Sequence, residues 1–265
     1  MNQIMDKFSL TGKTALITGG CYGIGFAIAT ALHGAGAKVV FCATSDASVE
    51  KALRAYEAEG ITDVKGYACD VTDEEKVKAA AADLAAEFGI HAEGYKMNAT
   101  DEAEVQAAVD ATIADFGRVD VLVNTAGILR FAAMEDLPLS DWEQVLNVNL
   151  TGYFITSQRF GREMIKAGQG RLVHISTVAS HSPETFSGVY SSTKAGVNMM
   201  SKMLAAEWGP YGVRSNCVEP CFVKTPMSAN FYADPEVEKS RSRLIATRRI
   251  GEVSDIANAV MFLAS

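Results

Sequence analysis

The chain contains 265 residues, of which 48% are hydrophobic and 21% are charged, and this composition excludes a disordered or fibrous protein. Its formal net charge of -8 repels polyanions and therefore argues against nucleic-acid binding as the main activity. The length fits either one large domain or two small ones.

The cysteines and the N-terminus indicate the compartment. The five cysteines are scattered without Cys-x-x-Cys or Cys/His spacing, so they predict neither a metal site nor a disulfide framework. No apolar segment follows a basic region at the N-terminus, so no secretion signal is predicted. We expect a soluble, cytoplasmic protein that binds neither nucleic acid nor membrane.

Short apolar runs alternate with helical patterns along the chain. The runs are rich in β-branched residues and lie at residues 14–18, 38–42, 64–69, 119–124, 171–176 and 213–218. Apolarity that is continuous rather than alternating is typical of strands buried on both faces. The segments between them are amphipathic, as where Val77, Ala81, Leu84 and Phe88 fall on one helical face. This alternation predicts a three-layer α/β fold, a doubly wound parallel sheet in a single domain over residues 1–265.

The first apolar run leads into a glycine-rich loop and then a helix. Thr18 and Gly19 end the run, and Gly23 and Gly25 follow. Gly19 permits a tight turn, Gly23 lets the backbone approach a pyrophosphate, and Gly25 allows close packing of the helix on the strand. The helix N-terminus supplies free N–H groups and a positive dipole end. This segment therefore predicts a nucleotide-binding loop.

An internal repeat relates residues 66–89 to residues 94–117. Each copy contains a strand end, a Thr-Asp helix start and an amphipathic helix that ends in Phe-Gly. Two copies are too few for a solenoid, so we interpret residues 90–117 as a duplicated strand-helix insertion. Only one copy can occupy the third-strand position, and the repeat itself leaves open which one.

Further motifs follow in a fixed order. They are NTAG at 124–127, NVNL at 147–150, IST at 175–177, Tyr190-x-x-x-Lys194 and EPCFVKT at 219–225. Together with the glycine loop they resemble the short-chain dehydrogenase/reductase family, from about Leu10 to Ser265. The resemblance implies a Rossmann fold and an NAD(P)-dependent oxidoreductase that transfers a hydride between nicotinamide and an alcohol or carbonyl substrate.

The pair Tyr190 and Lys194 also has a chemical rationale. A phenol with a pKa of about 10 is a poor base near neutral pH, and a nearby ammonium lowers that pKa by favouring the phenolate. Residues four apart on a helix project from the same face. The resemblance implies that Tyr190 is the acid/base, that Lys194 also holds the nicotinamide ribose, and that Asn149 helps to hold a proton-relay water.

The resemblance also assigns residues to the cofactor cleft. They are Thr18, Gly19, Gly23, Ile24, Gly25, Thr44, Asp70, Val71, Asn124, Ala126, Gly127, Tyr190, Lys194, Pro220, Val223 and Thr225. Asp70 and Val71 match the adenine corner. Asn98 and Ala99 of the second repeat copy are the alternative, and the first copy is favoured because it is the closer match.

The residues just after the second strand normally determine whether NAD or NADP is bound. An acidic side chain there binds the ribose 2′-OH, whereas an arginine accepts a 2′-phosphate. Residues 43–46 read Ala-Thr-Ser-Asp, and neither this segment nor Tyr22 in the glycine loop supplies a cation. This favours NAD, and NADP held by the hydroxyls of Thr44 and Ser45 is the alternative.

Several positions depart from the family pattern. Thr177 replaces the serine that orients the substrate, so it keeps the hydroxyl and adds a methyl group. Thr125 replaces an asparagine, and Cys221 replaces a glycine, which is strained if that position requires a positive φ. The chain stops at Ser265, where the family continues, so we expect the last strand to be missing. A nucleotide-binding protein with impaired catalysis is therefore a second hypothesis.

Two loop segments near the predicted cleft bear on the class of substrate. Residues 226–248 are polar and predict a lid over the cleft. His181, Ser182 and Glu184 are either hydrogen-bond partners of a hydroxylated substrate or solvated loop residues. Broad similarity to gluconate and polyol dehydrogenases implies a sugar acid or polyol, with 3-oxoacyl reduction as the alternative.

The last expectations from the sequence concern the other histidines, metal binding and the oligomeric state. His33, His91 and His174 have no carboxylate or cysteine partner in the sequence pattern, so core or surface roles are expected. No metal is expected. Because members of the family are commonly dimers or tetramers, the resemblance implies a homodimer or homotetramer.

Overall fold

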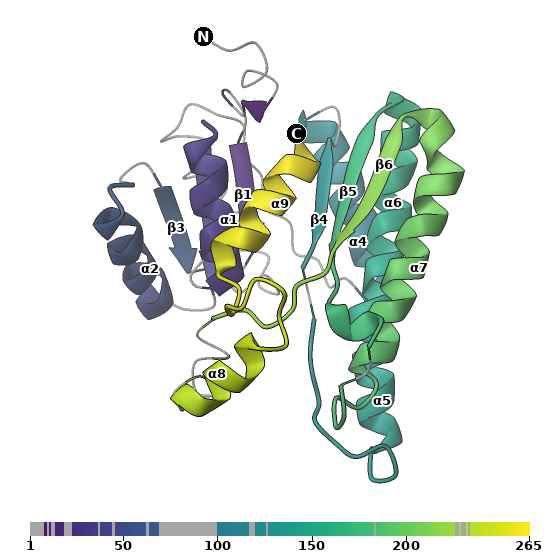
Figure 1. The fold of residues 1–265 in the computed structure, drawn as a ribbon. Coiled ribbons are helices and arrows are strands. Elements are labelled where there is room, and N and C mark those ends of the chain that lie inside the picture. The colour runs from purple at the N-terminus through teal and green to yellow at the C-terminus, as the bar shows by residue number, and fades with distance from the viewer. Residues whose placement is uncertain are drawn as a thin grey trace. The chain divides into compact units, whose positions relative to one another are not determined.

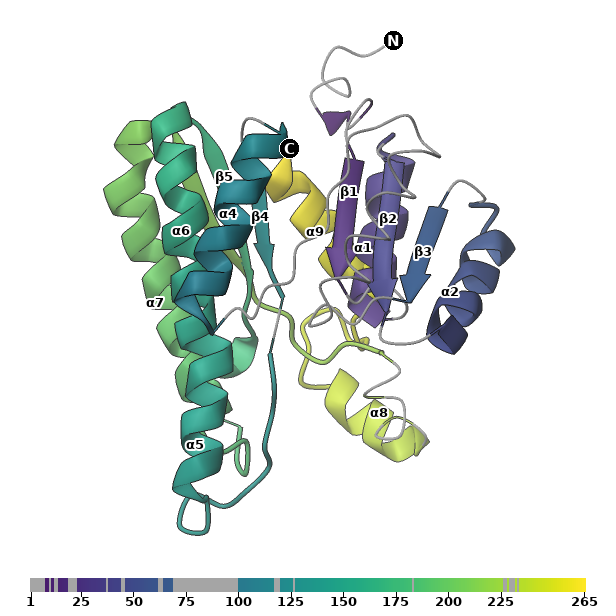
Figure 2. The ribbon, with the colours of Figure 1, turned by 180° about the vertical axis from the view of Figure 1, so that it is seen from behind.

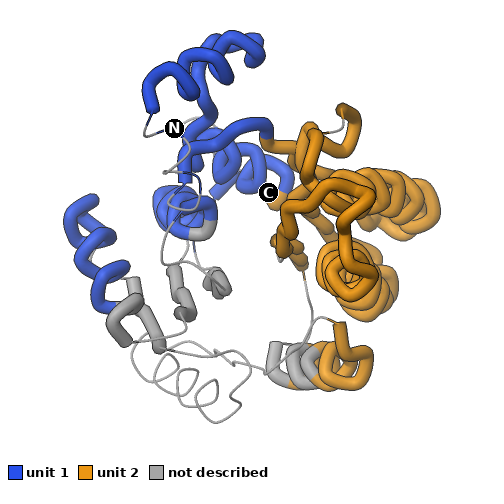
Figure 3. The backbone as a smooth tube through the Cα atoms, turned by 90° about the horizontal axis from the view of Figure 1, so that it is seen from below, with its two compact units in different colours: residues 1–96, 221–263, 265 blue, residues 97–220, 264 orange. Residues whose placement is uncertain are grey.

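A computed structural model gives the fold. It describes residues 8–9, 11, 14–18, 23–36, 38–43, 46–61, 64–68, 100–116, 120–125, 127–182, 184–225, 228, 232 and 234–265. The chain divides into two compact units (Figure 3): unit 1 comprises residues 1–96, 221–263 and 265, and unit 2 comprises residues 97–220 and 264. That residues 1–265 form one domain stays a prediction.

Unit 1 contains a three-stranded parallel sheet in the order β1-β2-β3. The strands are β1 (Thr14–Thr18), β2 (Lys38–Ala43) and β3 (Val64–Ala68). Parallel strands need crossover connections, and helices α1 (Gly23–Gly34) and α2 (Asp46–Ala58) supply the first two. Two later helices, α8 (Pro235–Ser242) and α9 (Val253–Ala264), follow in the chain (Figure 1).

Helix α9 packs against α1, the helix that follows the predicted nucleotide loop. Ala27 and Ile28 of α1 form a buried cluster with Ala257 of α9, and Val253 packs against it. The small alanine side chains let the two helix backbones approach closely. The end of the chain thereby supports the start of the predicted cofactor site.

Unit 2 contains a second three-stranded parallel sheet, in the order β4-β5-β6. The strands are β4 (Val121–Asn124), β5 (Gly170–Ile175) and β6 (Val213–Val218). The α-helices are α4 (Glu102–Phe116), α5 (Leu139–Leu146), α6 (Gly152–Ala167) and α7 (Tyr190–Trp208). Helices α4, α6 and α7 lie along one face of this sheet (Figure 2). Its core contains Met164, Leu172, Leu204 and Val213.

The described residues of unit 2 also include three short helical turns. They are the π-turn η2 (Asn147–Thr151), the 3-10 turn η3 (Val178–Ser180) and the 3-10 turn η4 (Gly209–Tyr211). The α/β class and the parallel strands predicted from the sequence are confirmed. Among the described residues the strands form two sheets of three, and no strand follows β6.

The two repeat copies have different places in the fold. The first copy supplies β3, which pairs with β2, whereas the second copy supplies α4 in unit 2. Glu102 at the start of α4 forms an ion pair with Arg159 of α6. The third strand therefore comes from the first copy. Residues 69–99 lie outside the described residues, and with them Asp70, Val71, Asn98 and Ala99.

Close packing of α6 on α7 depends on a glycine. A Cβ at Gly161 would overlap the ring of Trp208, which packs against the core of unit 2. Gly161→Ala is expected to lower the free energy of unfolding by roughly 1–3 kcal/mol, because overpacking forces the ring to move. Urea unfolding measures this change.

Gly209→Ala is the matched control for that substitution. A Cβ at Gly209 meets no atom within 4 Å, and its φ of -54° suits any residue. Its effect is expected to stay within about 0.5 kcal/mol. Equal effects of the two substitutions would show that the contact of Gly161 with Trp208 does not limit packing.

Candidate active site

The predicted catalytic residues gather in unit 2, near one edge of its sheet. Strands β4, β5 and β6 end at Asn124, Ile175 and Val218, and parallel strands present their carboxyl ends at the same edge. Thr177 follows β5, and the N-terminus of α7 is Tyr190. In open α/β sheets this edge is where ligands bind.

Tyr190 and Lys194 lie together on α7. The Lys194 Nζ atom is 5.8 Å from the centroid of the Tyr190 ring. Lys194 is only 3% exposed, whereas Tyr190 is partly exposed at the start of the helix. A partly exposed phenol beside a buried ammonium can exchange a proton with a bound molecule while the ammonium stays away from solvent.

The Lys194 ammonium is held by two acceptors. Its Nζ donates to the Ile175 carbonyl oxygen at 2.8 Å and to the Tyr153 hydroxyl at 3.3 Å. It also lies over the Tyr153 ring, 4.7 Å from the centroid. Burial lowers the pKa of Lys194 to about 8, because removal from water disfavours the charged form. Tyr153 is a member of this cluster that the sequence motifs did not point to.

The pKa of Tyr190 moves in the direction opposite to the one expected. Burial of the phenol raises the pKa, and the carboxylate of Glu184 raises it further. The net direction expected for this pKa is wrong for this structure, because burial and Glu184 together outweigh the Lys194 ammonium, which lies 5.8 Å from the ring centroid. Tyr190 is therefore a protonated acid at neutral pH.

Asn149 lies in the π-turn η2, between α5 and α6, and is fully buried. Its Oδ1 accepts from the Ile128 backbone N–H at 2.8 Å, and its Nδ2 donates to the Ile128 carbonyl at 2.8 Å. This clamp fixes the segment after β4. A Cβ at Gly127 in that segment would lie 3.5 Å from Asn149 Oδ1 and 3.7 Å from Lys194 Nζ, so Gly127 adjoins the ammonium.

The Thr177 hydroxyl is occupied by backbone groups. It donates to the Pro220 carbonyl at 3.2 Å and accepts from the Ala179 N–H at 3.3 Å, which caps η3. Ser176 points elsewhere, because its hydroxyl donates to the backbone carbonyl of Lys194 at 3.2 Å. Thr177 thus provides the hydroxyl group that follows β5, and the Ser176 hydroxyl links the end of β5 to α7.

Asn124 belongs to a buried polar network rather than to an open cleft wall. Its Nδ2 lies 3.2 Å from Ser157 Oγ and 3.2 Å from His174 Nδ1, and its Oδ1 accepts from Thr156. His174 is fully buried, and its Nε2 is 3.3 Å from Ser215 Oγ. The core role expected for His174 is confirmed, and the Asn124 side chain is directed into the same core.

The loop residues near Tyr190 are polar. His181 Nε2 lies 2.8 Å from a carboxylate oxygen of Glu219, and Asn198 Nδ2 lies 3.3 Å from the same ring nitrogen. Ser182 and Glu184 are exposed. A polar, partly acidic rim of this kind suits a substrate with hydroxyl groups.

The predicted cofactor residues of unit 1 are described in part. Thr18 ends β1, Gly23 opens α1 with a φ of 61°, and Ile24 and Gly25 follow within α1. This left-handed φ is one that glycine adopts without strain, which explains a glycine at that position. Gly19, Thr44 and Ala126 lie outside the described residues.

Backbone contacts within unit 1 position the segment that follows β6. Val223 forms a parallel β-bridge with Gly251, and the Thr225 backbone N–H donates to Ser228 Oγ at 2.9 Å. Cys221 is exposed and has no positive φ, so the strain considered for a cysteine at that position is absent. The chain accommodates this departure from the family pattern.

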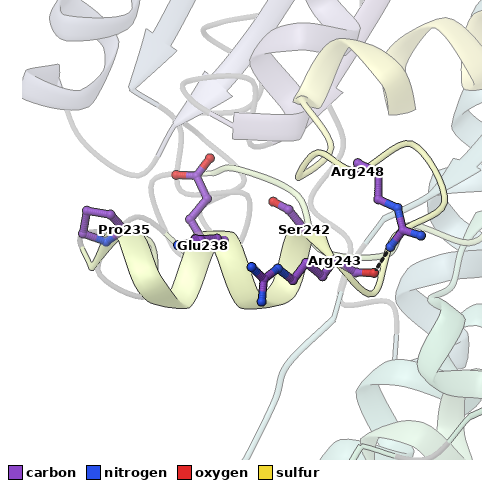
Figure 4. Close-up of a pocket in the computed structure, with 6 residues that line it drawn as sticks. Pro235, Glu238, Ser242, Arg243 and Arg248 are labelled. Carbon is purple, nitrogen blue, oxygen red and sulfur yellow. Dashed lines mark hydrogen bonds between the residues drawn. The ribbon is translucent and has the colours of Figure 1, made fainter.

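The described part of the predicted lid includes α8. Arg241 lies over the ring of Phe222 at 4.5 Å and near that of Tyr232 at 5.9 Å. A cavity of about 430 Å³ is lined by Pro235, Glu238, Lys239, Ser242, Arg243 and Arg248 (Figure 4). Arg248 donates to the Arg243 carbonyl, which closes the turn after the helix.

The described residues contain neither a candidate membrane span nor a candidate metal cluster. None of the helices in these ranges is both long and apolar enough to span a membrane. Within the same ranges, no group of three His, Cys, Asp or Glu side chains is placed to hold a metal ion.

Stability should depend on pH through His174. Burial lowers its pKa to about 4, from 6.5 for an exposed histidine, so the folded protein keeps the ring neutral. Between these values the unfolded chain binds more protons, so stability is lost as the pH falls from 6.5 towards 4. From pH 7 to pH 5, wild type should lose on the order of 2 kcal/mol more than His174→Gln.

Urea unfolding at the two pH values measures this difference. His33→Gln, which changes a histidine of α1 in unit 1, should retain the wild-type loss. The assignment to His174 fails if His174→Gln loses as much stability between pH 7 and pH 5 as wild type does.

Comparison with known proteins gives consistent matches. Residues 80–265 match the family model described as Enoyl-(Acyl carrier protein) reductase, and residues 13–90 match the one described as short chain dehydrogenase. D-threitol dehydrogenase of Mycolicibacterium smegmatis is 38% identical, over 97% of this chain and 88% of that protein. The 3-oxoacyl-[acyl-carrier-protein] reductase FabG of Aquifex aeolicus is 35% identical, over 98% of this chain and 92% of that protein.

A solved structure agrees with these relatives. The gluconate 5-dehydrogenase of Burkholderia cenocepacia in complex with NADP and tartrate has a TM-score of 0.74 and 29% identity to this chain. The match covers 99% of this chain and 92% of that chain.

Proposed function

Because the chain belongs to the short-chain dehydrogenase/reductase family of NAD(P)-dependent oxidoreductases, we propose that Tyr190 is its acid/base and Lys194 its cofactor-binding ammonium. The observation that carries this proposal is the cluster of Tyr190, Lys194, Asn149 and Gly127 near the carboxyl ends of β4 and β5. The reaction is the interconversion of an alcohol and a carbonyl compound.

The residues present fit a nicotinamide nucleotide. Gly23 starts α1 in the left-handed conformation. The N–H groups in the first turn of a helix have no partner within the helix, so they can bind phosphates. Gly127 has no side chain beside Lys194, which leaves room for a ribose against the ammonium. When bound, the nicotinamide supplies or accepts the hydride. Thr18, Ile24, Pro220, Val223 and Thr225 are the further described residues proposed to line its cleft.

The proton moves at the Tyr190 oxygen. In carbonyl reduction the Tyr190 hydroxyl donates its proton to the substrate oxygen, and in alcohol oxidation the phenolate accepts the hydroxyl proton. Since burial raises the pKa of Tyr190, the phenol suits reduction at neutral pH and oxidation requires alkaline pH. Thr177 orients the substrate oxygen, for which its hydroxyl must turn away from Pro220.

The substrate we propose is a polyol or a sugar acid. The relatives include a D-threitol dehydrogenase and a gluconate 5-dehydrogenase, and the rim of His181, Glu184 and Glu219 offers hydrogen-bond partners for hydroxyl groups. A 3-oxoacyl reductase is the second candidate, favoured by the FabG relative. The family resemblance also supports a cytoplasmic homodimer or homotetramer.

Tyr190→Phe tests the proposed acid/base. The change removes the only atom that can exchange a proton and keeps the ring, so turnover is expected to fall at least ~100-fold. Binding of NADH, followed by fluorescence titration, should change little. The substrate panel contains polyols, sugar acids and a 3-oxoacyl thioester.

Tyr211→Phe, at a tyrosine that is 55% exposed after α7, is the matched control and should keep wild-type turnover. Wild-type turnover in Tyr190→Phe would refute the assignment. Cofactor binding without turnover on any panel member would favour the second hypothesis, a nucleotide-binding protein with impaired catalysis.

Paired titrations with NADH and NADPH test the cofactor preference. No cation occurs at residues 43–46 after β2, so the side chains that this segment offers to a 2′-phosphate are two hydroxyl groups and the carboxylate of Asp46. NADH is expected to bind about tenfold more tightly, and Thr44→Arg should move the preference towards NADPH by supplying a phosphate partner. Tighter NADPH binding by wild type would instead select the alternative in which Thr44 and Ser45 hold the phosphate, as the NADP-bound relative suggests.

A further inference from the structure

The second phenol beside Lys194 has no role in the family motifs described above. Tyr153 lies in the first turn of α6, directly after the π-turn that contains Asn149, and is 1% exposed. Its hydroxyl meets the ammonium of Lys194, although the two residues are 41 positions apart in the sequence. A tyrosine hydroxyl buried this completely requires a polar partner.

The hydrogen bonds around Tyr153 have a fixed direction. The Tyr153 hydroxyl donates its single hydrogen to the Ile175 carbonyl at 3.2 Å, so it presents only lone pairs to Lys194. Lys194 donates to the same carbonyl and to the Tyr153 oxygen. The three groups form a closed triangle, which uses two of the three N–H donors of the ammonium.

We propose that Tyr153 is a positioning residue that holds the Lys194 ammonium and directs its third N–H donor towards the cofactor ribose and Tyr190. This inference rests on the proposed role of Lys194 in the reaction. Tyr153 itself exchanges no proton with the substrate, and burial raises its pKa, so its hydroxyl remains neutral.

The other titratable groups around Lys194 do not replace this contact. His174 on β5 is neutral because burial lowers its pKa to about 4, and burial raises the pKa of the Cys217 thiol on β6. Tyr190 on α7 is also protonated at neutral pH. Lys194 forms no ion pair with any described carboxylate. The Tyr153 oxygen and the Ile175 carbonyl are therefore its hydrogen-bond acceptors within unit 2.

Removing the Tyr153 hydroxyl should destabilise the charged form of Lys194. A hydrogen bond to an ionised group favours that form, so its loss lowers the pKa further below the value set by burial. Deprotonated Lys194 no longer favours the Tyr190 phenolate and binds the ribose less well. Activity should then decline at a lower pH than in wild type.

Tyr153→Phe tests this proposal because it keeps the ring under the ammonium and removes only the oxygen. The alkaline limb of the pH profile of kcat is expected to move down by about one pH unit, and KM for the cofactor to rise about threefold. Circular dichroism and thermal unfolding establish that the variant is folded. A purely structural role of Tyr153 would lower activity at every pH without moving the limb.

Tyr56→Phe is the matched control. Tyr56 is also 1% exposed and stacks on Phe26, so its change removes a buried hydroxyl of unit 1, whereas Lys194 belongs to unit 2. Its pH profile should equal that of wild type. If Tyr56→Phe moves the alkaline limb as far as Tyr153→Phe does, the shift is not specific and the proposal is overturned.

A ¹⁵N NMR titration of the lysine side chains gives a readout that needs no turnover. The Lys194 signal, assigned by its loss in Lys194→Arg, should titrate about one pH unit lower in Tyr153→Phe than in wild type. An unchanged Lys194 pKa overturns the positioning role. Absence of wild-type turnover on the substrate panel would instead count against the proposed function. The titration would still show whether the Tyr153 hydroxyl stabilises the charged form of Lys194.

Discussion

The buried ammonium of Lys194 is the constraint around which unit 2 is built. A charged group that is 3% exposed is costly unless hydrogen bonds replace its lost water. The end of β5 supplies the Ile175 carbonyl, α6 supplies the Tyr153 hydroxyl, and α7 supplies Lys194 itself. Three elements distant in sequence must therefore meet at one point. Ser176 adds a further link between β5 and α7 by donating to the Lys194 backbone carbonyl.

The π-turn between α5 and α6 makes this meeting possible. Its wider turn places Asn149 in the interior, where the amide clamps the Ile128 backbone, and π-turns inside α-helices are frequent at functional sites. Tyr153, four residues later, projects from a neighbouring part of the same helical surface. The π-turn thus positions both the segment that contains Gly127, through Asn149, and the Tyr153 hydroxyl, which accepts a hydrogen bond from Lys194.

The sequence predicted those features of the fold and the site that local residue patterns determine. Continuous apolar runs located β1 and β6 with their observed bounds, and the spacing of Tyr190 and Lys194 placed both on one face of α7. The contact of Tyr153 with Lys194 could not be predicted, because it depends on packing between distant helices. The only signal was a tyrosine three residues after NVNL. The direction of the Tyr190 pKa was also missed, since burial and Glu184 outweigh an ammonium bonded elsewhere.

The protonation states of the site bear on the direction of the reaction. At neutral pH Lys194 is mostly charged and Tyr190 is protonated, which is the state needed to donate a proton to a carbonyl oxygen. Under the role proposed for Tyr190, alcohol oxidation needs its phenolate form, so a rise in pH favours oxidation only while Lys194 keeps its charge. The Lys194 pKa of about 8 lies below that of the phenol, so the two requirements conflict. Groups that keep Lys194 charged, Tyr153 among them, therefore widen the pH range in which oxidation can proceed.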